Sequence, residues 1–127
     1  MREDPELRAK TEKILKATRE AYGFVPVVNQ VLSERPDLFV PSAALSRAVL
    51  DGDGELDAKT RHLCAVAAAT AAGGEYCVEV QMKHAVDAGA TKDEVLESIM
   101  IGSMMAYTRA QSYALRKYAA NFDIELE

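Results

Sequence analysis

Residues 56–99, LDAKTRHLCAVAAATAAGGEYCVEVQMKHAVDAGATKDEVLESI, carry the strongest helix signals of the chain. Asp57 is suited to cap a helix that runs through Ala72, because its carboxylate can accept from backbone N–H groups of the first turn. The alanine-rich run after Asp57 ends at Gly73 and Gly74, and glycine is the usual residue at a helix end. The first part of the stretch therefore predicts one helix closed by a tight turn.

A second and a third helix are expected after the glycine pair. The second should begin near Glu75 and end at Gly89, which stands where a left-handed residue closes a helix. Thr91 and Glu94 form a capping box, in which the threonine hydroxyl accepts from the Glu94 N–H and the Glu94 carboxylate reaches back. The box predicts that the third helix starts at Lys92.

Helix signals also cover the rest of the chain. Asp4 and Pro5 are typical of a helix start and Gly23 of a helix end, so a first helix is expected from Pro5 to about Tyr22. The further helices are expected at 24–32, at 37–50 with an interruption or kink near Pro41 and Ser42, and from Lys92 to about Asn121 with a continuation or a break before Arg109.

The clearest loop is DGDGELD, residues 51–57. It contains two glycines and four acidic residues, and it resembles half of a calcium-binding loop. The glycine and the distal glutamate of an EF-hand are not at their positions, so an acidic turn is the expected structure.

The composition indicates one all-α domain over residues 1–127. Trp is absent and aromatic residues make up only 6%, although 49% of the residues are hydrophobic. The apolar content is therefore mostly Ala, Val, Leu and Met, which favours helices. A formal net charge of -5 argues against a nucleic-acid partner, because phosphate binding requires a basic face.

Neither a membrane span nor a secretory signal is expected. The longest apolar runs fall short of the roughly 20 residues that cross a bilayer. The sequence MREDPELRAKTEK at residues 1–13 is too charged for a signal peptide. We expect a cytoplasmic protein with no membrane partner.

The helix around residues 96–107 has apolar side chains over most of its circumference. A monomer would leave many of them in water, so a homo-oligomer is expected. The alternative is a helix at the centre of a monomeric bundle. The apolar residues are Ile99, Met100, Ile101, Met104, Met105 and Ala106.

Two cysteines, Cys64 and Cys77, do not make a disulfide framework. If the glycines at 73 and 74 turn a helix pair, the two Cα atoms lie roughly 8 Å or more apart, beyond disulfide reach. No motif surrounds Cys64, which is expected to be buried on the Ala/Val face of its helix.

With these elements, residues 56–99 resemble the core of the alkylhydroperoxidase D-like (AhpD-like) and carboxymuconolactone decarboxylase family. That core has two antiparallel helices, a cysteine site at the start of the second, and a Gly-Ala-Thr-x-x-Glu-[Val/Ile] entry to the third. The resemblance implies an all-α, AhpD-like helical bundle with a central antiparallel helix pair. It also implies a homo-oligomer, a trimer or a hexamer.

The resemblance extends to the site only in part. The catalytic glutamate of peroxidase members falls on His62, the first cysteine on Gly74, the second on Cys77 and the histidine on Gln81. A two-cysteine peroxidase cycle ends in a disulfide, which Gly74 cannot form. His84 is not the family histidine, because it lies three residues beyond Gln81.

The candidate catalytic residues are Cys77, His62 and Gln81, with Glu79 and His84 as accessory candidates. Cys77 is expected in the first turn of its helix, where the positive end of the helix dipole favours a thiolate and nearby carboxylates oppose it. His62 is expected to face Cys77 as a base, and Gln81 to donate a hydrogen bond or hold a water. The alternative for Cys77 is a small buried hydrophobe, which most free cysteines are. No metal and no cofactor is expected.

Three functions are compatible with these residues. The first is a peroxiredoxin-like thiol oxidoreductase, an antioxidant enzyme in which Cys77 attacks a peroxide or a disulfide and an external thiol donor completes the cycle. The second is lactone decarboxylase-like acid–base chemistry on a small carboxylate. The third is a non-enzymatic oligomeric binding protein that has lost the catalytic set. The acid–base candidates are His84, His62, Glu79, Lys83 and Arg61.

Overall fold

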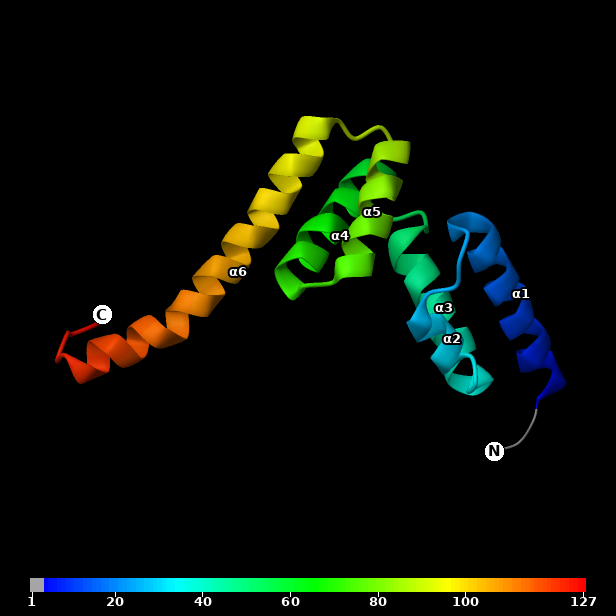
Figure 1. The fold of residues 1–127 in the computed structure, drawn as a ribbon, viewed down its shortest axis with the longest axis horizontal. Coiled ribbons are helices and arrows are strands. Elements are labelled where there is room, and N and C mark those ends of the chain that lie inside the picture. The colour runs from blue at the N-terminus through cyan, green and yellow to red at the C-terminus, as the bar shows by residue number, and fades with distance from the viewer. Residues whose placement is uncertain (1–3) are drawn as a thin grey trace. The chain divides into compact units, whose positions relative to one another are not determined.

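A computed structural model describes residues 4–127, and every regular element in that range is a helix. The all-α class predicted from the sequence is confirmed. No helix among the described residues is long and apolar enough to cross a membrane. The helices are α1 (Pro5–Tyr22), α2 (Val27–Leu32), α3 (Pro36–Leu50), α4 (Ala58–Ala72), α5 (Glu75–Asp87) and α6 (Lys92–Asn121), and Figure 1 shows them in order.

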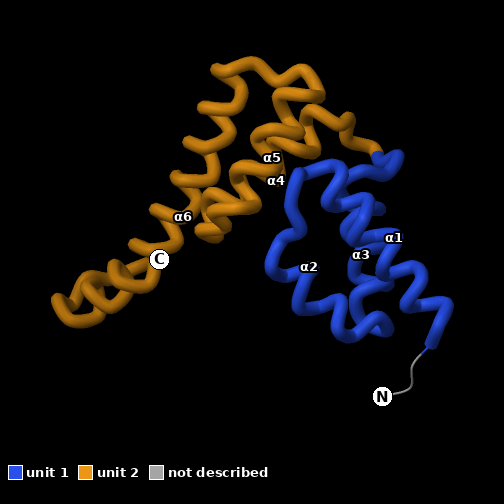
Figure 2. Tube along the Cα trace, turned by 45° about the vertical axis from the view of Figure 1, so that its right-hand side comes forward, with its two compact units in different colours: residues 1–54 blue, residues 55–127 orange. Residues whose placement is uncertain are grey.

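The described chain forms two compact units, which Figure 2 distinguishes by colour. One ends at Gly54 and contains α1, α2 and α3, and the other begins at Glu55 and contains α4, α5 and α6. A single domain over residues 1–127 stays a prediction. The candidate site residues all belong to the second unit.

In the first unit, α1 packs against α3, and the side chain of Phe39 in α3 is buried. The helix expected at 24–32 begins only at Val27, so the predicted start was three residues too early. Pro26 explains the difference, because it disfavours helical geometry at the residue before it. The interruption expected near Pro41 does not occur, since α3 continues through that residue to Leu50.

The predicted helix ends of the second unit are confirmed. The Asp57 carboxylate accepts a hydrogen bond of 2.8 Å from the backbone N–H of Thr60, and it starts α4. Gly73 ends α4 with a φ of 75°, a left-handed conformation that glycine adopts without steric cost. Both hydrogen bonds of the capping box at Thr91 and Glu94 are present.

The core of the second unit lies where α4, α5 and α6 meet. Val66 of α4 is fully buried, and the Ser98 hydroxyl of α6 donates a hydrogen bond of 2.6 Å to the carbonyl oxygen of Leu63. Gly102 allows α6 to approach α4 closely, because a β-carbon there would lie 2.2 Å from the carbonyl oxygen of Ala67. The small residues of this core hold α4 in a fixed position against both neighbours. The buried cluster and its partly buried neighbours are Ala85, Ala90, Val95, Leu63, Met82 and Ile99.

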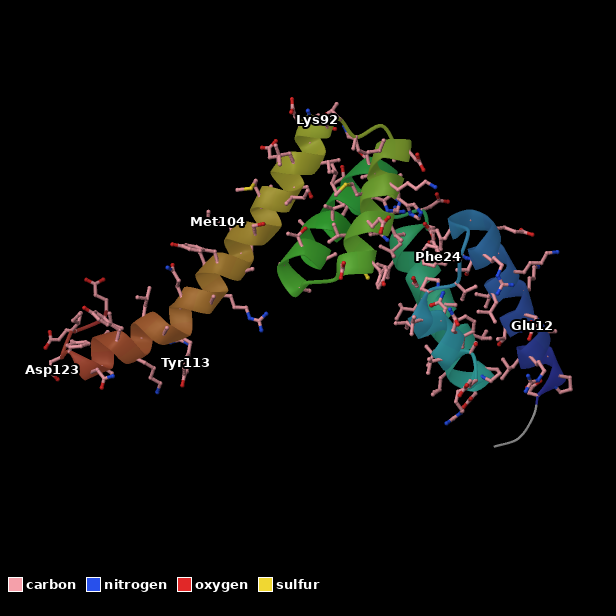
Figure 3. All side chains as sticks on the ribbon, in the orientation of Figure 1. Glu12, Phe24, Lys92, Met104, Tyr113 and Asp123 are labelled. Atoms are coloured by element: carbon pink, nitrogen blue, oxygen red, sulfur yellow. The ribbon has the colours of Figure 1, made fainter. Side chains whose placement is uncertain are left out.

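Helix α6 is continuous from Lys92 to Asn121, without the break that was one alternative before Arg109. Its second half extends past α4 and α5, as Figures 1 and 2 both show. Figure 3 shows side chains projecting along its length, with Met104 and Tyr113 labelled. These two side chains are 50% and 63% exposed. Within the second unit, a large apolar surface of α6 is therefore uncovered.

Candidate functional site

Cys77 lies in the first turn of α5, as predicted, and it is exposed. Burial as a small hydrophobe is therefore wrong for this residue. Gly74 occupies the N-cap and offers no side-chain hydrogen bond to the helix start. The backbone N–H groups of the first turn thus have no side-chain cap, and they can stabilise negative charge that develops close to them.

Gln81 lies one helical turn after Cys77 and links α5 to α4. Its Oε1 is 2.8 Å from Nδ1 of His62, and both residues are buried. Since a carbonyl oxygen can only accept, Nδ1 of His62 carries the proton and donates it. The hydrogen-bond partner that the structure gives Nδ1 of His62 is the amide of Gln81, and the expectation that His62 faces Cys77 stays a prediction.

The Gln81 amide has a second polar end. Its oxygen is engaged by His62, so its nitrogen is the donor that remains for other groups. Helical side chains lean toward the N-terminus of their helix, which is the direction of Cys77. The arrangement places an amide donor, fixed by a buried imidazole, next to the turn that carries the thiol.

His84 packs edge-on against His62, a contact that the sequence analysis missed. The ring centroids are 5.0 Å apart and the ring planes are inclined at 84°. The position of the turn at residues 73 and 74 could have predicted this contact. His62 lies eleven residues before Gly73 and Ala85 lies eleven residues after Gly74, so a folded-back helix pair brings residues 84 and 85 next to His62.

The remaining candidates lie apart from this cluster. Cys64 is exposed, so the expected burial was wrong. It is two positions from His62, and residues two apart on a helix face different sides. Glu79 is exposed and also two positions from Cys77, so it points away from the thiol. Both cysteines are free thiols.

An ion pair joins α4 to the start of α6. Lys59 Nζ lies 3.0 Å from the Glu94 carboxylate, which also accepts from the backbone N–H of Thr91. These contacts, with the backbone N–H as the larger cause, hold the pKa of the Glu94 carboxyl below its ordinary value. The pair is partly solvated, so its contribution is that of a surface contact.

The fold and the cysteine-bearing helix start place the chain among small all-α proteins, with its candidate site residues on the consecutive helices α4 and α5. The chain belongs to the carboxymuconolactone decarboxylase family, whose profile matches residues 36–120. A protein of Paracoccus denitrificans described as "uncharacterized protein 4 in cox locus" is 34% identical over 82 residues, which cover 65% of this chain and 73% of that protein. No solved structure matches the chain.

Proposed function

We propose that this protein is a thiol-dependent, peroxiredoxin-like oxidoreductase in which Cys77 is the nucleophile. The observation that carries the proposal is the position of Cys77: it is exposed, in the first turn of α5, one turn before Gln81. A reactive thiol needs both access and groups that stabilise the thiolate. The exposed surface provides the first, and the uncapped start of the helix provides the second.

The proposed reaction has two stages. The Cys77 thiolate attacks one oxygen of a hydroperoxide, an S–O bond forms as the O–O bond breaks, and the leaving alkoxide takes a proton to become an alcohol. The resulting sulfenic acid reacts with an external thiol, which forms a mixed disulfide and releases water. A second external thiol then releases a small-molecule disulfide and restores the Cys77 thiol.

His62 and Gln81 support this cycle without transferring a proton to the thiol directly. The buried His62 fixes the amide through the 2.8 Å hydrogen bond, and the amide nitrogen of Gln81 is the donor for a peroxide oxygen or a water. A fixed donor stabilises the leaving oxygen because it needs no reorientation during the reaction. His62 is therefore a positioning residue, and Cys77 is the catalytic one.

Single-turnover kinetics with hydrogen peroxide test the proposal. The wild-type protein and Cys64→Ser should form sulfenic acid, detected by dimedone labelling and mass spectrometry, at the same rate. Cys77→Ser should show no labelling at residue 77 and no thiol-dependent peroxide consumption. Equal consumption by Cys77→Ser and wild type would overturn the proposal, and so would labelling confined to Cys64.

A lactone decarboxylase-like acid–base enzyme is the second candidate function. The observation that favours it is the contact between His62 and His84, because two neighbouring imidazoles can serve as a base and an acid toward one substrate. Carbon dioxide release from a panel of γ-lactone carboxylates, lost in His84→Ala and retained in Cys77→Ser, would support this function. No release from any member would exclude it for that substrate class.

We also propose that α4 and α5 form the central antiparallel pair of an AhpD-like bundle, and that copies of the chain assemble through α6. The apolar residues of α6 support the assembly, because Met100, Ile101 and Met105 are each more than half exposed within one chain. Apolar surface of this extent is typical of an interface. A trimer or a hexamer is the expected size.

A further inference from the structure

We propose that His62 and His84 together bind a divalent transition-metal ion of the zinc type. This site goes beyond the proposed thiol function, since neither cysteine is part of it. The imidazoles come from α4 and α5, two helices fixed against each other by the core of the second unit. The ligands are thus contributed by two rigid elements and not by one mobile loop.

The distance between the two rings is close to the distance between two histidine ligands of one metal ion. One ring nitrogen of each histidine lies within 4.8 Å of one on the other. Two imidazole nitrogens on a tetrahedral zinc ion, each at about 2.0–2.1 Å from the metal, are about 3.3 Å apart. The rings therefore need to approach by at most about 1.5 Å, which rotation of the χ2 torsion of His84 supplies while His62 keeps its hydrogen bond to Gln81.

Gln81 prepares His62 as a ligand. Its Oε1 accepts the proton of Nδ1, so the lone pair of the neutral ring is on Nε2. Histidine ligands in metal sites generally donate their other ring N–H to an oxygen acceptor, which fixes the tautomer and the ring orientation. The hydrogen bond at 2.8 Å already provides this arrangement. Gln81 is therefore a positioning residue of the proposed site.

The chemistry of the ligands selects the ion. Imidazole suits Zn²⁺, Cu²⁺ and Ni²⁺, whereas Mg²⁺ and Ca²⁺ prefer oxygen ligands. His62 and His84 supply two of the four positions of a tetrahedral zinc ion, and water or an anionic ligand completes the shell. A site with positions open to water can also accept a substrate oxygen.

Nuclear magnetic resonance of the histidine rings tests the site directly, because the chain contains only two histidines. The full chain with Cys64→Ser and Cys77→Ser, which removes thiolate binding, is treated with chelator and titrated with Zn²⁺. Both imidazole spin systems should shift together and saturate at one ion per chain, with Nδ1 of His62 still protonated. Mg²⁺ should leave both unchanged. A shift of one ring alone, or of neither at saturating Zn²⁺, would overturn the proposal.

Competition with a fluorescent zinc indicator measures the contribution of each residue in the same background. His84→Ala should weaken binding at least tenfold, and Gln81→Leu about 10- to 100-fold, as expected for a residue that orients a ligand. The exposed Lys83→Ala is the matched control on α5 and should bind as the parent does. Unchanged affinity in His84→Ala would contradict the assignment. The peroxide assay is run in the presence of chelator, so failure of the metal site and failure of the thiol function are distinguishable.

Discussion

Gly74 and Cys77 approach each other so closely across the start of α5 that a β-carbon on Gly74 would lie 3.3 Å from that of Cys77. Disulfide-bonded cysteines have β-carbons about 3.5–4.5 Å apart. Gly74 has a φ of -80°, which any residue adopts, so a side chain at this position causes no backbone strain. The backbone spacing at this position is therefore compatible with a second cysteine opposite Cys77.

We predict that Gly74→Cys, made in a Cys64→Ser background, forms a disulfide with Cys77. A relaxation of a few tenths of an ångström brings the β-carbons into the disulfide range. Oxidation with glutathione disulfide should remove two hydrogen atoms from the protein mass and both free thiols, with release of two glutathione molecules, and dithiothreitol should reverse it. Gly74→Ser is the matched control: its single thiol cannot close an internal disulfide, and glutathione disulfide converts it to a mixed disulfide of higher mass. Two thiols that stay free under oxidising conditions would contradict the predicted geometry.

Gln81→Leu should destabilise the fold by about 1–3 kcal/mol, because it leaves the buried Nδ1 of His62 without its partner. Urea unfolding followed by circular dichroism measures the change. Lys83→Leu places the same side chain at an exposed position of α5 and should change stability by less than about 0.5 kcal/mol. Equal effects of the two substitutions would show that the hydrogen bond contributes little.

Gly102→Ala should destabilise the contact between α4 and α6. The new methyl group meets the Ala67 carbonyl oxygen at 2.2 Å, so the two helices must separate. Overpacking of this kind typically costs about 1–3 kcal/mol, even though alanine is the better helix former. Thermal denaturation should show a lower Tm than wild type, while Ser112→Ala on the exposed part of α6 should not. A raised Tm in Gly102→Ala would mean that helix propensity outweighs the clash.

Stability at acid pH should depend on Glu94. Its carboxyl pKa is lowered in the folded chain, so its stabilising effect is present above the ordinary pKa and is lost as the pH falls through the folded value. Glu94→Gln keeps an acceptor for the Thr91 N–H but does not titrate. We expect the Tm of the variant to fall less than that of wild type from about pH 5 downward. Parallel Tm profiles of the two proteins would contradict this linkage.

Charge on the apolar surface of α6 should disrupt assembly. Ile101 and Met105 are each 57% exposed within one chain, and they lie one helical turn apart. If copies of the chain cover this surface, the double substitution to glutamate leaves monomers, because buried unpaired carboxylates are costly. Light scattering after size-exclusion chromatography measures the mass, with Gln111→Glu as the control. A wild-type monomer would refute the proposed assembly.

Local signals explain why most helix ends were predicted. The caps at Asp57 and Thr91 each depend on a residue three positions away, so the sequence alone specifies them. The missed features depend on tertiary contacts. Cys64 is exposed and His62 is buried because one side of α4 faces the neighbouring helices and the other does not. The alanine-rich sequence of α4 is similar on both sides, so it does not predict which side is buried.

For the candidate site, the sequence predicted the position of Cys77 but not the partners of His62. The position of Cys77 in the first turn follows from the glycine pair before it, and this prediction is confirmed. The partner of His62 required knowledge of how α4 and α5 align, since Gln81 lies nineteen positions away. The same alignment brings His84 into contact with His62. In the sequence, His84 was compared only with Cys77 on the same helix, so this contact was not predicted. Catalytic roles for these residues stay predictions.

The buried pair of His62 and Gln81 couples the two positions energetically. Peroxidases that the chain resembles have an acid and an imidazole at the corresponding two positions, whereas here an imidazole and an amide occupy them. Replacing either residue alone would leave the other buried without its hydrogen-bond partner. Substitutions at the two positions should therefore be non-additive in their effect on stability, because each residue is the buried hydrogen-bond partner of the other.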